Sequence, residues 1–185
     1  MIDETYQTAE RKMKRAVEAL QHDLATVRTG RASPALLERI QVDYYGAPTP
    51  LNAVATINVP EPRLLVIQPW DKKMLPVIEK AIQKSDLGLT PSSDGSVVRL
   101  VIPPLNEERR RELVKQVHKR VEDARVAVRN CRREALEELR KAERERHLSE
   151  DEVKRAQERL QKLTDSFIAQ VDEVGRRKEN EVMEV

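Results

Sequence analysis

The second half of the chain carries a long apolar pattern with helical spacing. Apolar residues recur every three or four positions from 113 to 142, which places them on one stripe of an α-helix. We predict a helix over about residues 106–146, roughly 60 Å long at 1.5 Å per residue. Its stripe consists of Leu113, Val117, Val121, Ala124, Val128, Cys131, Ala135, Leu139 and Ala142.

Two further segments show the same spacing. The first ends near Arg28, and the other begins at Ser149, where Ser149 and Glu152 have the spacing of a capping box. Only a few residues separate the second and third helices, so these two form an antiparallel hairpin against which the first helix packs. The pattern predicts an elongated antiparallel three-helix bundle. The two stripes are Tyr6, Ala9, Met13, Val17, Leu20, Leu24 and Val27, and Val153, Ala156, Leu160, Leu163, Phe167, Val171 and Val174.

The helix-breaking residues are confined to one window. All ten prolines lie between Pro34 and Pro104, and four of the five glycines lie between Gly30 and Gly95. Because these residues interrupt helices and are tolerated in turns and edge strands, the window is an insert in the bundle. The predicted bundle domain is therefore residues 1–29 and 106–185, and the insert is residues 30–105.

The insert has the pattern of a small α+β domain. Alternating or β-branched runs at 40–44, 63–67 and 96–102 predict strands, with turn clusters at 46–48 and 92–95. Between two of these strands, residues 72–84 predict a helix with Leu75, Ile78 and Ile82 facing inward. We expect one small sheet covered by one helix, so the whole chain falls in the α+β class.

Composition excludes several classes of protein. The single cysteine, Cys131, allows no disulfide within the chain, and its place on the helical stripe favours buried core over a reactive thiol. No apolar run approaches the roughly 20 residues needed to cross a bilayer. The N-terminal residues are acidic, unlike those of a signal or transit peptide, so we expect a cytoplasmic protein without a membrane partner.

The sequence contains no recognisable catalytic arrangement. His22, His118 and His147 are scattered, and neither a metal-binding spacing nor a phosphate-binding glycine loop occurs. The abundant carboxylates alternate with lysines and arginines, as solvated ion-pair faces do. We expect no metal, no cofactor and no small-molecule substrate, and an enzyme built on the insert is the weakest interpretation.

One helix carries a strong local charge imbalance. The whole chain nearly balances 34 basic against 32 acidic residues, but residues 109–133 hold ten basic residues and three acidic ones. Arg125, Arg129 and Arg132 share one helical face at i, i+4 and i+7, with Arg133 beside them, and such a row suits the phosphates of folded RNA. The alternative is a solvated face neutralised by acids on neighbouring helices. Aromatic residues are few, so base stacking is not expected.

The two connections between bundle and insert form a candidate hinge. Gly30 permits unusual backbone angles, and Pro103 and Pro104 fix theirs, so bending would be localised where the two short connections run side by side. The alternative is a fixed corner built from ordinary turn residues. The candidate hinge residues are Thr29, Gly30, Ala32, Pro34, Pro103, Pro104 and Leu105.

Four segments in this order resemble a known family. Residues 27–37, 102–110, 113–115 and 128–135, read with the chain length and the position of the insert, are similar to bacterial ribosome recycling factors. The resemblance implies an L-shaped, tRNA-sized molecule with a hinged β/α/β domain. It also implies that Arg132 contacts RNA, with Arg129 and Arg133 beside it, and that Arg28 and Arg31 are basic positions at the hinge.

The resemblance further implies a function without catalysis. Members of this family bind the post-termination ribosome, contact large-subunit ribosomal RNA, and act with elongation factor G and GTP to release ribosomes from mRNA and separate the subunits. We expect a monomer with these two partners. The main alternative, from another class, is a helical adaptor or chaperone-like protein whose charged faces bind other proteins. The salt dependence of binding distinguishes these two interpretations, because phosphate contacts weaken steeply as the salt concentration rises.

Overall fold

The computed structural model describes residues 1–184, which form two compact units. The bundle unit comprises residues 1–24 and 114–180, and the sheet unit comprises residues 25–113 and 181–184. These boundaries fall inside the long helices, a few residues away from the junctions at which the glycines and prolines divide the sequence. The α+β class is confirmed.

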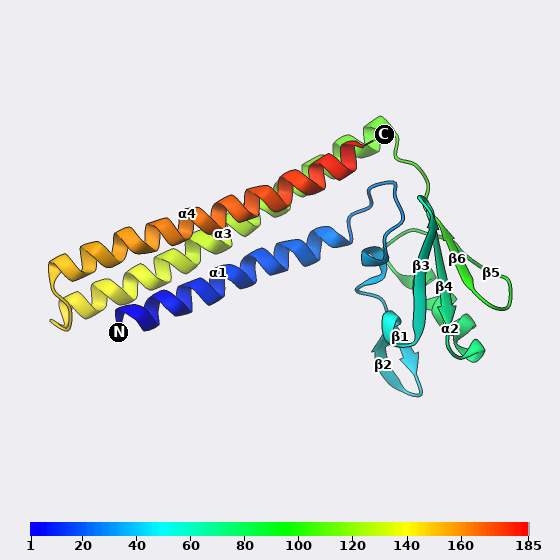
Figure 1. Ribbon diagram of the computed structural model, residues 1–185, viewed down its shortest axis with the longest axis horizontal. Coiled ribbons are helices and arrows are strands. Elements are labelled where there is room, and N and C mark those ends of the chain that lie inside the picture. Colours follow the sequence, from blue (N-terminus) through cyan, green and yellow to red (C-terminus); the bar gives the residue numbers. More distant parts are fainter. Residues whose placement is uncertain (185) are drawn as a thin grey trace. The chain divides into compact units, whose positions relative to one another are not determined.

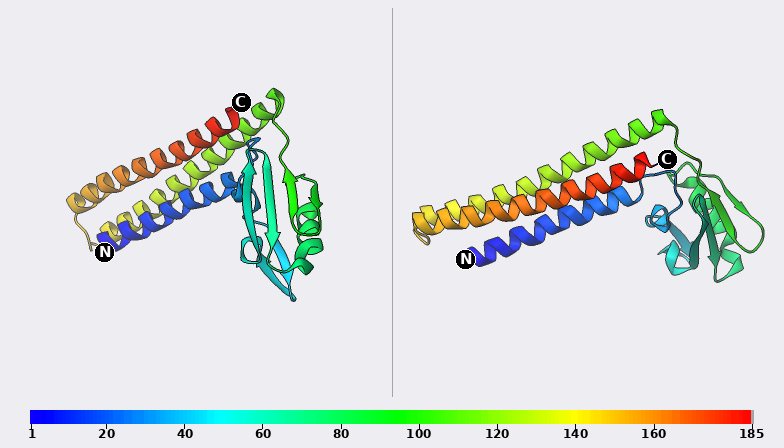
Figure 2. Two further views of the ribbon diagram at one scale, coloured as in Figure 1. Left: turned by 45° about the vertical axis from the view of Figure 1, so that its right-hand side comes forward. Right: turned by 45° about the horizontal axis from the view of Figure 1, so that its top comes forward.

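The bundle unit is made of three long helices. They are α1 (Ile2–Ala25), α3 (Glu107–Arg144) and α4 (Glu150–Met183), which run side by side in all three views (Figures 1 and 2). Most residues of the predicted stripes form their core, whereas Tyr6, Cys131 and Val174 are half-buried. The Glu152 amide donates to Ser149 Oγ at 3.2 Å, as an N-cap requires. The first helix ends before the predicted Arg28. The apolar pattern alone does not mark this end, because Val27 continues the stripe and is buried although it lies outside the helix.

Polar contacts at the edges of the core fix α1 against its neighbours. Lys12 Nζ pairs with Glu134 on α3 at 2.9 Å. Arg159 on α4 pairs with Asp3 at 3.1 Å, and its guanidinium lies 3.8 Å from the ring centroid of Tyr6. These exposed pairs contribute little energy individually, so their main effect is to define the alignment of the helices.

Cys131 corrects one expectation. The thiol is half-buried and not part of the closed core, because it lies at the edge of the stripe near the Lys12–Glu134 pair. Burial raises the pKa of the Cys131 thiol, and the Glu134 carboxylate raises it further. A raised pKa disfavours the thiolate, so the expected lack of reactivity has a different cause from the predicted full burial.

Gly175 allows α3 and α4 to approach closely. It is a buried residue within α4, and a Cβ added there would overlap with Val121 Cγ2 on α3. Valine is β-branched and has little rotamer freedom in a helix, so its methyl group cannot move aside cheaply. The glycine is therefore explained by packing in the bundle.

Replacing Gly175 with alanine should destabilise the bundle. Overpacking costs about 1–3 kcal/mol, which outweighs the gain of about 1 kcal/mol in helix propensity. Urea unfolding followed by circular dichroism should give a lower free energy of unfolding. In the Val121→Ala background the same glycine change should be neutral or stabilising. Equal stability of Gly175→Ala and the parent protein would reject the close contact.

The sheet unit contains two antiparallel sheets where one was predicted. The first pairs β1 (Gln41–Tyr44) with β2 (Ala47–Pro50), and the second has the order β3-β4-β6-β5 (Figure 1). The strands of the second sheet are β3 (Ala55–Glu61), β4 (Leu64–Pro69), β5 (Pro91–Ser93) and β6 (Val98–Val101). The prediction of one sheet was wrong because β2, β3 and β5 carry prolines, which suggest turns. Each lies at a sheet edge, where a missing N–H is tolerated.

The helix of the insert lies close to its predicted position. A short 3-10 helix, η3 (Lys72–Met74), leads into α2 (Leu75–Lys84), and Leu75, Ile78 and Ile82 face inward as expected. They pack with the apolar sides of β4 and β6 and with two short 3-10 helices, η1 (Pro34–Leu37) and η2 (Leu51–Ala53). The sheet unit thus has a core of its own.

Candidate nucleic-acid interface

The basic segment of the sequence lies on α3. Asn106 caps this helix, since its Oδ1 accepts the Arg109 amide at 2.7 Å. Arg125, Arg129 and Arg132 follow one another along the same face, and Arg133 is exposed beside them. A continuous helix of 38 residues carries all of them, so their backbone positions are fixed by hydrogen bonds.

Arg125 differs from the other arginines of this row. Its guanidinium lies 2.6 Å from Asp172 Oδ1 on α4 and 3.0 Å from Glu122 on its own helix. The hydrogen bonds to Asp172 and then Glu122 raise the pKa of Arg125 further above its ordinary value. Its charge is therefore compensated within the bundle, as the solvated-face alternative expected.

The remaining arginines of the row are much less engaged. Arg129 makes one long contact to Glu122, at 3.4 Å, and Arg133 makes one to the Asn130 amide oxygen, at 3.5 Å. Arg132 is half-buried, and within residues 1–184 it has no ion pair or hydrogen bond from its guanidinium. These three side chains keep most of their donors available for an external anion.

Arginines also gather where the chain enters and leaves the insert. Burial lowers the pKa of Arg28, and the nearby positive charge of Arg109 lowers it further. The buried Nε atoms of Arg28 and Arg110 have no partner within the described chain. Arg31 is exposed and pairs with Glu184 at 3.4 Å. Arg109 and Arg110 were not predicted as site residues, although the run of three arginines beside the junction was a usable signal.

Gly30 is the most constrained residue of the candidate hinge. It is buried with a φ of 80°, and a Cβ on it would lie 3.5 Å from Leu105 Cγ in the returning connection. Pro103 and Pro104 are exposed, and Thr29 is half-buried. The two connections therefore touch at the Gly30–Leu105 contact.

Two other candidate hinge residues belong to regular local structure. The Ala32 amide donates to the Pro62 carbonyl at 2.7 Å, in the turn between β3 and β4. Pro34 begins η1, and Ser33 Oγ accepts the Ala35 amide at 3.3 Å as its N-cap. On the returning side, the Ile102 amide donates to the Arg63 carbonyl at 2.7 Å.

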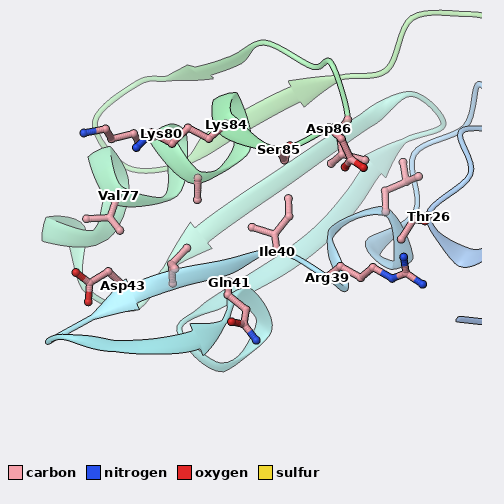
Figure 3. Close-up of a pocket in the computed structure, with 14 residues that line it drawn as sticks. Thr26, Arg39, Ile40, Gln41, Asp43, Val77, Lys80, Lys84, Ser85 and Asp86 are labelled. Atoms are coloured by element: carbon pink, nitrogen blue, oxygen red, sulfur yellow. The ribbon is translucent and has the colours of Figure 1, made fainter. Parts of the chain in front are cut away.

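The sheet unit contains a cavity of about 680 Å³ (Figure 3). Lys80 and Lys84 on α2 line it opposite Arg39 and Gln41. Two hydroxyl side chains, Thr26 and Ser85, line it, and Ser85 at the C-terminal end of α2 donates to the Ile82 carbonyl at 2.6 Å. The cavity is lined by both basic and acidic side chains, and the Ser85 hydroxyl is bonded to a backbone carbonyl rather than to a base.

Two other kinds of site are absent from residues 1–184. No three side chains of His, Cys, Asp or Glu lie together as metal ligands would. None of the helices in the described chain is both long and apolar enough to span a bilayer.

Comparison with known proteins identifies the family. The model of the family described as "Ribosome recycling factor" matches residues 20–183. The chain belongs to the ribosome recycling factor family. It is 60% identical over 185 residues to a ribosome-recycling factor of Heliobacterium modesticaldum and 57% identical over 185 residues to one of a Roseiflexus species, in both cases over 100% of each chain. The family predicted from the four segments is confirmed.

Solved structures of ribosome recycling factors have the same fold. A solution structure of the ribosome recycling factor matches with a TM-score of 0.83 and 49% identity, covering 100% of this chain and 98% of the other. A second match has a TM-score of 0.70 and 51% identity over 100% of both chains. It is a model of the T. thermophilus ribosome recycling factor, reported with E. coli elongation factor G bound to the E. coli post-termination complex.

Proposed function

We propose that this protein is a translation factor that binds post-termination ribosomes through large-subunit ribosomal RNA. With elongation factor G and GTP, it would release ribosomes from mRNA and separate their subunits. The observation that carries the proposal is the α3 row of Arg129, Arg132 and Arg133 with few internal partners, in a chain of the ribosome recycling factor family.

The chemistry of this row favours phosphate over carboxylate partners from the same chain. A guanidinium presents several donors in a plane and meets a phosphate with two parallel hydrogen bonds. Because α3 is a continuous helix packed in a bundle, the three side chains need little reorganisation before binding. Arg125 has a different role in this proposal, since Asp172 already engages it. It would align α3 and α4.

The junction arginines would form a second region of RNA contact. Arg28 and Arg31 carry the expected basic positions, and Arg109 and Arg110 add to them. A buried guanidinium nitrogen without a partner is energetically costly, and a phosphate oxygen would satisfy it. The lowered pKa of Arg28 indicates that its positive charge is under-compensated, which an anion would correct.

We propose a hinge that is shorter than the one predicted from the sequence, because Ala32 and Pro34 do not belong to its bending part. Hydrogen bonds tie Ala32 to Pro62 and Ile102 to Arg63, so the chain inside these points moves with the sheets. Bending would be confined to residues 29–31 and 103–105, around the Gly30–Leu105 contact. Ala32 and Pro34 would act as the fixed end of the hinge. Residues 32–102, which include both sheets and α2, would then serve as a lever on which elongation factor G acts.

The protein itself would catalyse no reaction in this scheme. The Ser85 hydroxyl in its cavity is bonded to a backbone carbonyl, and the energy would come from GTP hydrolysis by elongation factor G. We propose that it acts as a monomer in the cytoplasm, with residues 1–29 and 106–185 as the RNA-binding domain and residues 30–105 as the hinged domain.

Light scattering of purified post-termination ribosomes tests the function directly. Mixing them with this protein, a cognate elongation factor G and GTP should lower the scattering as subunits separate. Leaving out any one component, or using a non-hydrolysable GTP analogue, should abolish the change. No splitting by a folded protein, together with salt-tolerant binding to other proteins, would favour the helical adaptor instead.

A further inference from the structure

Three exposed aromatic side chains lie on the sheet unit, and Tyr45 contacts the residue next to Trp70. The chain has five aromatic residues, and three of them are Tyr44, Tyr45 and Trp70. Their exposed fractions are 39%, 80% and 69%. Phe167 is buried in the bundle, and Tyr6 is covered by Arg159. An exposed group of large aromatic rings on a small domain is a feature of binding surfaces.

Tyr45 occupies a turn position at which a large aromatic residue is unusual. Tyr44 pairs with Ala47, so Tyr45 and Gly46 form a two-residue hairpin loop, with φ values of 50° and 86°. Two positive φ angles define a type I′ turn, for which asparagine followed by glycine is strongly preferred. A bulky aromatic residue there is strained by roughly 1 kcal/mol. The strain is compatible with a ring retained for contact with something outside the chain.

Internal hydrogen bonds hold the rings and use their polar atoms. The Tyr45 hydroxyl donates to Asp71 Oδ2 at 3.4 Å, and the Trp70 indole N–H donates to Thr56 Oγ1 at 3.1 Å. The rings of Tyr44 and Tyr45 meet edge to face, with centroids 4.7 Å apart. With the polar atoms of Tyr45 and Trp70 already engaged, what remains exposed is ring surface.

The chain around these rings carries two carboxylates, Asp43 and Asp71, and two lysines, Lys72 and Lys73. Both nearby carboxylates are already engaged, since Asp43 accepts the Gly46 amide at 2.8 Å and Asp71 accepts the Lys73 amide at 3.0 Å. Lys72 and Lys73, which directly follow Asp71, are exposed and have no ion pair within residues 1–184. Ring faces beside free ammonium groups are the combination that binds single-stranded nucleic acid.

We propose that Tyr44, Tyr45 and Trp70 form a platform on which an unpaired RNA base stacks, while Lys72 and Lys73 contact the adjoining phosphates. This aromatic platform is separate from the arginine row on α3 and would give the sheet unit an RNA contact of its own. The small number of aromatic residues argued against base stacking, but the exposure of three of them on the sheet unit compensates for their number. The inference does not depend on the proposed ribosomal function.

The only tryptophan of the chain makes the platform directly observable. Titration of the full protein with a short uridine oligonucleotide, followed by intrinsic fluorescence, should quench the Trp70 emission as the base stacks. An oligomer of the same length with abasic riboses retains the phosphates and should quench little. Equal quenching by both oligomers, or none by either, would overturn the proposal.

Tyr45→Asn separates the binding role of the ring from the stability of the turn. Asparagine suits the type I′ turn, so the variant should melt at the same temperature or higher. Its affinity for the uridine oligonucleotide, measured by Trp70 quenching, should fall about tenfold, as expected for loss of one stacking partner. A variant that is stable and retains full affinity would contradict the platform.

Paired lysine changes test the phosphate contacts. Lys72→Gln with Lys73→Gln should reduce the salt dependence of binding by about 0.7 in logarithmic slope for each lysine. The matched control is Lys80→Gln with Lys84→Gln, which makes an equal change of charge on α2 instead of η3 and should leave the slope unaltered. An equal effect of both pairs would overturn the local contact. A saturable change of Trp70 emission with elongation factor G but not with RNA would assign the platform to a protein.

Discussion

Replacing Arg132 with alanine should weaken binding to large ribosomal subunits by roughly tenfold to a hundredfold, as expected from losing a charge-assisted contact worth about 1.5–3 kcal/mol. The guanidinium has no partner within residues 1–184, so little folding stability depends on it. Filter binding or sedimentation with purified subunits measures the affinity, and thermal melting monitors the fold. Arg132→Lys should retain part of the affinity, because it keeps the charge but loses the planar fork.

Arg125→Ala is the matched control for this experiment. Its guanidinium is engaged by Asp172 and Glu122, so the substitution should reduce stability by at most about 1 kcal/mol and reduce subunit affinity much less than Arg132→Ala. The salt dependence of binding should also become shallower for Arg132→Ala alone. If the two variants lost affinity equally, the assignment of the contact to the less engaged arginines would be wrong.

A disulfide across the two connections should abolish recycling while leaving ribosome binding intact. Gly30→Cys and Leu105→Cys are suitable positions, because a Cβ on residue 30 would lie 3.5 Å from Leu105 Cγ. Oxidation would lock the two connections together and oppose bending at residues 29–31 and 103–105. The readout is subunit splitting by light scattering, with binding measured in parallel.

The cross-link carries its own control. Cys131→Ala must be present in all samples, since Cys131 is the chain's only native thiol. Reduction of the same preparation should restore splitting, which separates the effect of the bond from the strain of a cysteine at the positive φ of residue 30. Full activity of the verified oxidised form would reject the hinge.

Helical periodicity predicted the bundle well because its signal is long and repeated. Stripes of seven to nine apolar residues define each helix in the sequence, and the observed helices follow them. The insert was harder, since β2, β3 and β5 are short or contain proline. An edge strand tolerates Pro50 or Pro91 because that side of the strand needs no hydrogen bond, and this depends on sheet order, which the local sequence does not carry.

The candidate site shows the same division between local and long-range information. The spacing of Arg125, Arg129 and Arg132 places them on one face. Arg125 differs from the other two because it pairs with Asp172 on another helix, and the spacing does not show this pairing. Likewise, Tyr45 and Trp70 are separated by 25 positions and are linked only through the Asp71 carboxylate beside Trp70. Residue counts alone therefore underestimated this surface.

The position of the insert also determines the order in which the bundle is completed during synthesis. Lys12 in α1 meets Glu134, 122 positions later, and Asp3 meets Arg159, 156 positions later. Arg125 and Asp172, which join α3 to α4, are only 47 positions apart. Because closing a longer loop costs more entropy and takes longer, we expect the hairpin of α3 and α4 to form first and α1 to dock last. A newly made α1 would therefore expose its apolar stripe until α3 and α4 have been made, and we expect this helix to need chaperone protection during synthesis.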